Sequence, residues 1–301
     1  MKRILSFAFL LAVVLGASAQ QTFVEIPCNA DKIIKHWNNS NAPHSNEITA
    51  DETRSKAGHI ANVSQTVFYL FKADADKATG QAVVILPGGG YRNVCIEREG
   101  FAIAEYFKSI GVTALVVKYR LPNFGHKEVP LEDAQAGLAY LRKNAKKLGV
   151  DPAKVGICGS SAGGHLAAYT STFTEDAKKP AFTVLFYPVI SGTGCMTHHG
   201  TFLHLLGKVH PLALREQYSL ENQVTATTPP TILLLSDNDG TVPPISSLLY
   251  YQALKFHGVK ASMHIYPEGG HGWVCRKGFR YEKAWQDALC DWLKHLNRKK
   301  K

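Results

Sequence analysis

The feature that most constrains the fold is a repeated alternation of short apolar segments with longer amphipathic ones. Segments 82–86, 112–117, 182–187 and 231–235 are apolar almost throughout and lack the apolar–polar alternation of a half-exposed strand. Strands of that kind are buried on both faces, as happens when helices cover a mainly parallel sheet. The pattern therefore predicts an α/β fold, a mostly parallel sheet with helices on both faces.

The rest of the chain is organised around this alternation. Residues 20–64 are polar and weakly periodic, and we interpret them as an N-terminal extension with room for a short strand. Segment 191–221 interrupts the rhythm and predicts a short insertion over the sheet edge, within one domain that spans residues 65–297. The predicted strands cover 66–71, 82–86, 112–117, 154–158, 182–187, 231–235 and 261–266, and the predicted helices cover 101–110, 131–148, 162–172, 244–256 and 281–296.

The first residues have the pattern of a secretory signal. Lys2 and Arg3 precede an apolar run over 4–15, and Ala17-Ser18-Ala19 places small residues at both key cleavage positions. This predicts a signal peptide over 1–19 and an exported protein, periplasmic or secreted. An uncleaved anchor is the alternative, but the run is shorter than the roughly 20 apolar residues of a membrane helix. We expect no membrane association after cleavage.

The basic charge of the chain has a simple distribution. The formal net charge is +10, loss of Lys2 and Arg3 lowers it to +8, and leaving out the basic tail 298–301 lowers it to +4. A mildly basic body with a solvated basic end is a weak signal for nucleic acid, and no nucleic-acid motif accompanies it. We therefore expect no nucleic-acid partner.

The strongest local motif is GSSAGGH over 159–165, which follows a predicted strand and opens a predicted helix. That context is typical of a G-x-S-x-G nucleophile elbow with Ser161 at its centre. A nucleophile on such a sharp turn needs almost no side chain two residues before and after it, as Gly159 and Gly163 provide. Ser160 lacks this flanking pair. A phosphate-binding loop is not indicated, because no Gly-Lys-Ser/Thr follows.

A nucleophilic serine needs a base and a residue that orients the base. In this class the chain order is Ser, then Asp or Glu, then His. Asp237 and Asp239 follow the strand 231–235, and either could be the acid on this evidence alone. His271 lies between glycines after the last predicted strand, third in the expected order, and we expect it to be the base.

The tetrahedral intermediate of acyl transfer needs donors for its oxyanion. The backbone N–H of Ala162, the residue after the nucleophile, is one expected donor. Further donors are expected from the glycine loop Pro87-Gly88-Gly89-Gly90-Tyr91, which follows the strand 82–86 and resembles the H-G-G-G loop of lipases and esterases.

The remaining histidines and cysteines carry no metal signature, and we expect neither a metal nor a cofactor. His165 is expected to be packed on the elbow helix, and His198, His199 and His204 match no zinc spacing. No C-x-x-C is present, so neither a zinc ribbon nor a thioredoxin-type redox site is indicated. Export permits disulfides, but six cysteines allow about 15 pairings and the sequence does not choose among them, and Cys158 is expected to be a buried free thiol. The six cysteines are Cys28, Cys95, Cys158, Cys195, Cys275 and Cys290.

Taken together, these motifs resemble the α/β-hydrolase esterases of the acetylxylan esterase or xylanase-like esterase group, over about residues 65–296. The resemblance implies Asp239, in an Asp-x-x-Val-Pro motif, as the acid, and Gly89 and Gly90 as oxyanion donors. It also implies a serine esterase that removes O-acetyl groups from xylan or xylo-oligosaccharides. The motifs that carry it are 87–91, 99–100, 118–122, 133–134, 159–167, 187–190, 205–207, 228–230, 239–243 and 269–272.

Several alternatives stay open at this stage: a feruloyl or other carbohydrate esterase, a prolyl-oligopeptidase-type peptidase, a lipase, and a carbohydrate-binding relic. A small acyl group is expected if Tyr91 and Trp273 lean over Ser161 and wall the acyl side as substrate-binding residues. Both rings could instead be packed against the sheet. The sequence leaves the oligomeric state open.

Overall fold

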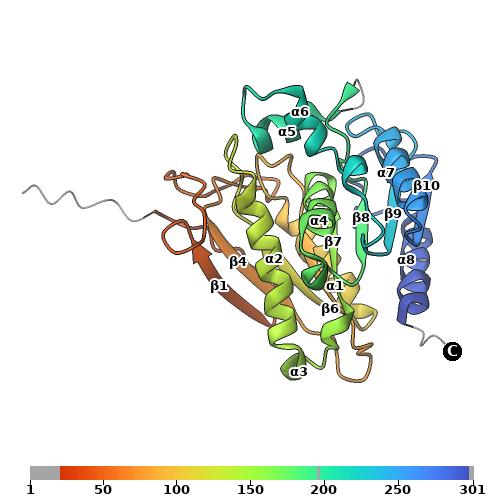
Figure 1. Ribbon diagram of the computed structural model, residues 1–301. Coiled ribbons are helices and arrows are strands. Elements are labelled where there is room, and N and C mark those ends of the chain that lie inside the picture. Colours follow the sequence, from red (N-terminus) through yellow and green to blue (C-terminus); the bar gives the residue numbers. More distant parts are fainter. Residues whose placement is uncertain (1–20, 195–196, 298–301) are drawn as a thin grey trace, which may run out of the picture.

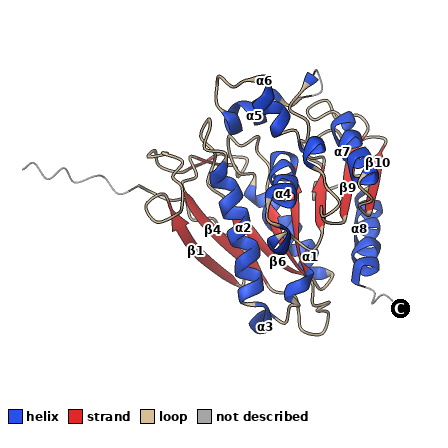
Figure 2. Ribbon diagram, in the orientation of Figure 1, coloured by secondary structure: helices blue, strands red, loops and turns tan. Residues whose placement is uncertain are grey.

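One eight-stranded sheet organises the molecule (Figures 1 and 2). The structure, a computed structural model, describes residues 21–194 and 197–297. The expected signal peptide and the basic tail 298–301 lie outside these described residues. The sheet order is β1-β4-β6-β5-β7-β8-β9-β10, and its strands are β1 (Lys32–Asn38), β4 (Gln65–Phe71), β5 (Ala82–Leu86), β6 (Thr113–Lys118), β7 (Val155–Ser160), β8 (Thr183–Phe186), β9 (Thr231–Ser236) and β10 (Ala261–Tyr266).

The sheet is mainly parallel. Strand β4 runs antiparallel to its neighbours β1 and β6, and every other neighbouring pair is parallel. The edge strand β1 belongs to the stretch that the sequence predicted to be an N-terminal extension. A separate short hairpin pairs β2 (Thr53–Arg54) with β3 (Ile60–Ala61).

Helices cover both faces of the sheet. Tyr106 of α1 donates a hydrogen bond of 2.8 Å to the Gln286 carbonyl of α8, and its ring lies 4.8 Å from that of Trp285, so α1 and α8 pack together. Helices α2 and α4 lie on the face turned toward the viewer in Figure 1. The predicted α/β fold is confirmed. The helices are α1 (Ala102–Ser109), α2 (Glu128–Lys143), α3 (Ala145–Leu148), α4 (Ser161–Phe173), α5 (His199–Leu206), α6 (Leu212–Gln217), α7 (Pro244–Phe256) and α8 (Glu282–Asn297).

One predicted helix is divided in two. The sequence predicts a continuous helix over 131–148, but the structure has α2 and α3 separated at Asn144. The Asn144 side chain donates a hydrogen bond of 2.8 Å to the Tyr140 carbonyl and so competes with the backbone of the helix. None of the helices in the described ranges has the length and apolarity that crossing a membrane requires.

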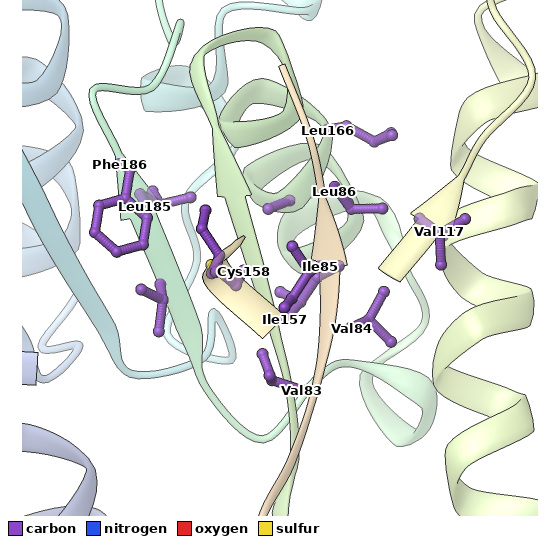
Figure 3. Close-up of a cluster of buried hydrophobic side chains, with 14 of the residues drawn as sticks. Val83, Val84, Ile85, Leu86, Val117, Ile157, Cys158, Leu166, Leu185 and Phe186 are labelled. Atoms are coloured by element: carbon purple, nitrogen blue, oxygen red, sulfur yellow. The ribbon is translucent and has the colours of Figure 1, made fainter. Parts of the chain in front are cut away.

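The core lies between the central strands and these helices, as Figure 3 shows for one cluster. Every residue of β5, β6, β7 and β8 is buried, which explains why their sequences lack alternation. Cys158 sits in this cluster as a buried free thiol beside Ile85 and Ile157. A rigid apolar centre of this kind holds the carboxyl ends of the parallel strands in place.

Two buried ion pairs tie the N-terminal residues to the body. Lys118, at the end of β6, contacts both carboxylate oxygens of Glu52 at 2.7 Å. Arg120 binds Asp133 of α2 at 2.8 Å and also donates to the His44 carbonyl at 2.6 Å. Removing one partner of such a pair would leave the other charge buried without compensation. The contacts to Glu52 and to the His44 carbonyl therefore hold residues 44–52 against the sheet.

Candidate active site

Ser161 stands at a sharp turn between β7 and α4. Its φ of +54° is in the left-handed region, which is strained for a residue with a side chain. A Cβ added to Gly159 would collide with the Gly163 carbonyl oxygen, and one added to Gly163 would collide with the Leu86 carbonyl oxygen. The two flanking glycines are therefore required by close backbone approach, as the sequence motif predicts.

Ser161, His271 and Asp239 form one hydrogen-bonded chain. His271 Nε2 lies 2.8 Å from Ser161 Oγ, and His271 Nδ1 lies 2.7 Å from Asp239 Oδ2. A carboxylate can only accept, so Nδ1 carries the hydrogen and Nε2 is left to accept the serine proton. This arrangement is suited to nucleophilic attack by serine on an acyl carbon.

The structure separates the candidates that the sequence left open. Asp239 is buried, and its second oxygen accepts 2.9 Å hydrogen bonds from the backbone of Thr241 and Val242, whereas Asp237 is exposed. Ser160 is fully buried at the end of β7, so its hydroxyl cannot reach a substrate. The loop geometry thus places Asp239, and not Asp237, against the imidazole.

The glycine loop after β5 lies against the serine. A Cβ on Gly88 would come within 2.9 Å of the Ser161 Cβ, so only glycine allows this approach. The N–H of Gly88 already donates to Glu99 at 2.8 Å, which leaves Gly89 and Gly90 as the loop residues beside the reacting centre. Ala162, in the first turn of α4, has an N–H without an intrahelical acceptor.

These residues open into a cleft of about 500 Å³. In the described part of the chain, no aliphatic or large aromatic side chain lines it. Burial raises the pKa of the Cys95 thiol to about 12, so this thiol stays protonated and is no rival nucleophile. The lining residues are His59, Gly89, Gly90, Arg92, Asn93, Cys95, Arg98, Glu99, Ser161, His198, Gly200, His204, Thr241, His271 and Gly272.

The two predicted substrate-binding residues lie outside the cleft. Tyr91 and Trp273 are 1% and 0% exposed, and neither lines the cleft, so the prediction that they wall the acyl side is wrong. Tyr91 has a left-handed backbone (φ +58°) and its hydroxyl bonds to His165, while Trp273 stacks on Phe279 at 4.5 Å. Trp273 also packs edge-on against Phe186, and local sequence could not reveal distant partners such as His165 and Phe186.

The histidines of the insertion contribute to the cleft without forming a metal site. His198 and His204 line it, and His198 bonds to Thr201 at the start of α5. Among residues 21–194 and 197–297, no three His, Cys, Asp or Glu side chains are grouped so as to hold a metal ion. Sequence analysis left His198 without a role because nothing local places the insertion over Gly90.

Glu99 is a site residue that sequence reasoning assigned no role. It lies in a π-helical turn, Glu97–Phe101, directly before α1 and is 6% exposed. One oxygen accepts from the Gly88 N–H and the other from the Tyr187 hydroxyl at 2.9 Å. The Tyr187 ring lies 4.8 Å from that of His271, so Glu99 connects the glycine loop with the support of the imidazole.

A second buried chain runs through His165 on the elbow helix. Its Nε2 lies 3.0 Å from the Tyr218 carbonyl, which can only accept, so Nδ1 at 3.1 Å accepts from the Tyr91 hydroxyl. Burial lowers the pKa of His165 to about 4, which keeps the ring neutral. This chain joins the glycine loop, the elbow helix and the insertion.

The site matches what the comparison with protein families finds. The family described as the α/β hydrolase fold matches residues 83–275, which hold Ser161, Asp239 and His271. The chain belongs to the α/β hydrolase family. The nucleophile follows β7 and begins α4, which is the strand–turn–helix context that the sequence motif predicted.

Two curated proteins resemble the chain over about two thirds to three quarters of its length. It is 35% identical over 225 residues to an acetylxylan esterase of Xylanibacter ruminicola, covering 73% of this chain and 47% of that protein. It is 32% identical to endo-1,4-β-xylanase B of Butyrivibrio fibrisolvens, covering 68% of this chain and 34% of that protein. The chain thus spans half or less of the length of these curated relatives.

A solved structure gives a fuller match. The acetyl ester-xyloside bifunctional hydrolase of Caldicellulosiruptor lactoaceticus aligns with a TM-score of 0.73 and 30% identity. The alignment covers 89% of this chain and 97% of that one. The whole α/β hydrolase body, and not only the motif regions, therefore has a close structural counterpart.

The buried His165 predicts a specific acid sensitivity. Its folded pKa of about 4 is below the ordinary value of 6.5, so the unfolded chain takes up the proton first and stability falls as pH drops from about 6.5 toward 4. The contribution is about 3 kcal/mol for a shift of this size. His165→Gln keeps one donor and one acceptor but cannot titrate, so urea unfolding should show a correspondingly shallower loss between pH 7 and pH 4.

The matched control is His257→Gln, at an exposed histidine after α7. It should retain the wild-type slope. An unchanged slope in His165→Gln would contradict the assigned neutral state of the buried ring.

Proposed function

We propose that this α/β hydrolase is a serine esterase that removes O-acetyl groups from xylan or xylo-oligosaccharides. The observation that carries the proposal is the Ser161–His271–Asp239 chain, with contacts of 2.8 and 2.7 Å, opening into a cleft beside Gly89 and Gly90. The acetylxylan esterase and the acetyl ester-xyloside hydrolase among the similar proteins support the choice of substrate.

The proposed reaction has two half-steps. Ser161 Oγ bonds to the acetyl carbon as its proton passes to His271 Nε2. The bond between the acetyl carbon and the sugar oxygen then breaks, and His271 gives the proton to that oxygen, which leaves as a sugar hydroxyl. Water next attacks the acetyl-serine, gives a proton to His271, and the proton returns to Ser161 as acetate leaves. Asp239 stabilises the imidazolium in both half-steps.

The oxyanion of each tetrahedral intermediate needs donors that are in place before the reaction. The backbone N–H groups of Gly89, Gly90 and Ala162 are the proposed donors. Two facts support them: Gly89 and Gly90 line the cleft with Ser161, and Ala162 begins the helix that follows the nucleophile.

Acetate release tests the proposal directly. The protein should release acetate from acetylated xylo-oligosaccharides faster than ferulate from feruloylated ones, and should not cleave peptides. Ser161→Ala should lower kcat about a million-fold, as expected when the three side chains act as a unit. Acetate is measured by an enzyme-coupled assay, with circular dichroism as the check that the variant is folded.

Near-normal turnover by a folded Ser161→Ala variant would refute the serine mechanism. Peptide cleavage without acetate release would favour the peptidase alternative, and absence of any hydrolysis would favour a binding relic.

The lining of the cleft predicts a short acyl group. No aliphatic or large aromatic side chain of the described residues lines it, so the cleft has no apolar slot in which added methylenes would be buried. In an apolar slot each methylene would contribute about 0.8 kcal/mol, or about fourfold in kcat/KM. We therefore expect kcat/KM for 4-nitrophenyl esters to fall steadily from acetate to octanoate. A rise toward octanoate would instead identify a lipase-like pocket.

Export completes the proposal. The charged Lys2 and Arg3, the apolar run 4–15 and the small residues at Ala17 and Ala19 support cleavage after Ala19 and a periplasmic or secreted protein. N-terminal sequencing of the protein from its native host should begin at Gln20. A protein recovered in the cytoplasm with an intact Met1 or Lys2 would contradict this.

A further inference from the structure

We propose that the preferred ester carries a carboxylate on a sugar next to the acetylated one, and that Arg92 and Arg98 bind this carboxylate. The inference rests on the proposed esterase function and specifies its substrate class. Two kinds of polysaccharide place an acetylated sugar beside a uronic acid. One is xylan with an acidic branch, and the other is a polysaccharide whose main chain is itself acidic.

The starting observation is the position of the two arginines. Arg92 and Arg98 are both exposed, and both line the cleft that contains Ser161 and His271. Within the described residues, no ion pair and no side-chain hydrogen bond involves either guanidinium. Other exposed arginines are engaged: Arg54 contacts Glu97 at 2.5 Å and Arg280 contacts Glu268 at 3.3 Å.

No acidic group at the cleft compensates these charges. Glu99 is the only acidic residue among the described residues that line it, and its oxygens accept from Gly88 and Tyr187. Glu97, on the same turn, is paired with Arg54. Burial lowers the pKa of His198, so this ring is neutral near pH 7. Among the described residues that line the cleft, Arg92 and Arg98 are the permanent positive charges.

The backbone places both arginines in the segment that also forms the glycine loop. The Arg92 N–H donates to the Gly89 carbonyl at 3.1 Å, and Arg98 lies in the π-helical turn whose Glu99 holds Gly88. A carboxylate bound by these side chains would be held at a fixed position relative to Gly89 and Gly90. The charge would then help to align the neighbouring acetyl group with Ser161.

The chemistry of the pair favours a carboxylate. Guanidinium groups match carboxylates through paired N–H donors, and they stay charged at every physiological pH. A neutral xylose chain offers them hydroxyl and ether oxygens but no opposite charge, and Asn93 and Thr241 already provide polar groups in the same cleft for sugar hydroxyls. The lining is thus better suited to an acidic oligosaccharide than to a neutral one.

The test compares three substrates at low salt: acetylated xylo-oligosaccharides with a glucuronic acid branch, the same oligosaccharides without it, and acetylated oligogalacturonides. Wild-type kcat/KM should be about five- to tenfold higher on an acidic ester than on the neutral one, as two exposed charge contacts would give. Which acidic substrate leads identifies the source. The preference should shrink between about 0.01 M and 1 M salt, as the Debye length falls from about 30 Å to about 3 Å.

The variants are Arg92→Gln, Arg98→Gln and the double substitution, with Arg280→Gln as the matched control outside the cleft. The double variant should bring the acidic-to-neutral ratio of kcat/KM close to one, mainly through KM, while the control keeps the wild-type ratio. Equal wild-type rates on acidic and neutral acetyl esters would overturn this inference but leave the esterase proposal intact. Failure to release acetate from all three substrates would instead overturn the proposed function.

Discussion

The close approach of three backbone segments around Ser161 determines the geometry of the rest of the site. Gly163 packs on the carbonyls of Leu86 and Pro87, and Gly88 packs on Ser161, so the nucleophile turn and the glycine loop are in contact. A side chain at Gly88 or Gly163 would push these segments apart. Because both contacts involve backbone atoms, the spacing between the serine and the expected oxyanion donors is set before any substrate binds.

A strained turn of this kind persists only if its surroundings are rigid. A left-handed φ at a serine is unfavourable by about 1–3 kcal/mol. The turn is held in this conformation by the fully buried strand β7, which precedes it, and by the neighbouring buried strand β5. Their parallel pairing directs both carboxyl ends to one edge of the sheet. The apolar core shown in Figure 3 therefore has a catalytic consequence, since it keeps the serine and the glycine loop in one position.

Sequence predicted the features that depend on local patterns. Strand β5, helix α7 and strand β10 have the predicted bounds. For β5 the continuous apolar run reports burial directly, because every residue of that strand is buried. Ser161 and His271 were identifiable because neighbouring glycines mark sharp or open backbone. Strand β1 was missed as part of the main sheet, since most of its residues are exposed and only its pairing with β4 defines it.

The errors and omissions share a physical origin in contacts between distant segments. Tyr91 directly follows the glycine loop and Trp273 is two residues from His271, yet both rings turn into the core, where they pack against His165 and Phe186. Conversely, Arg98 and Glu99 are neighbours in one π-helical turn, but Arg98 is exposed and Glu99 is buried. Proximity along the chain therefore identified the segments that form the site, but it did not identify which of their side chains face the cleft.

The described part of the insertion after β8 is held to the body by polar contacts and forms one wall of the cleft. Gly192 is held by Ser219 and Arg215, and the backbone of Ser191 by Ser246 at 2.9 Å on α7. Tyr218 is bonded to His165 on the helix that begins at Ser161. Because these contacts are buried or partly buried polar bonds, movement of the described part of the wall would leave donors and acceptors unpaired. These contacts hold the described part of the wall in place before an ester binds, so we expect selection among esters to depend on the groups that line the cleft, among them Arg92 and Arg98.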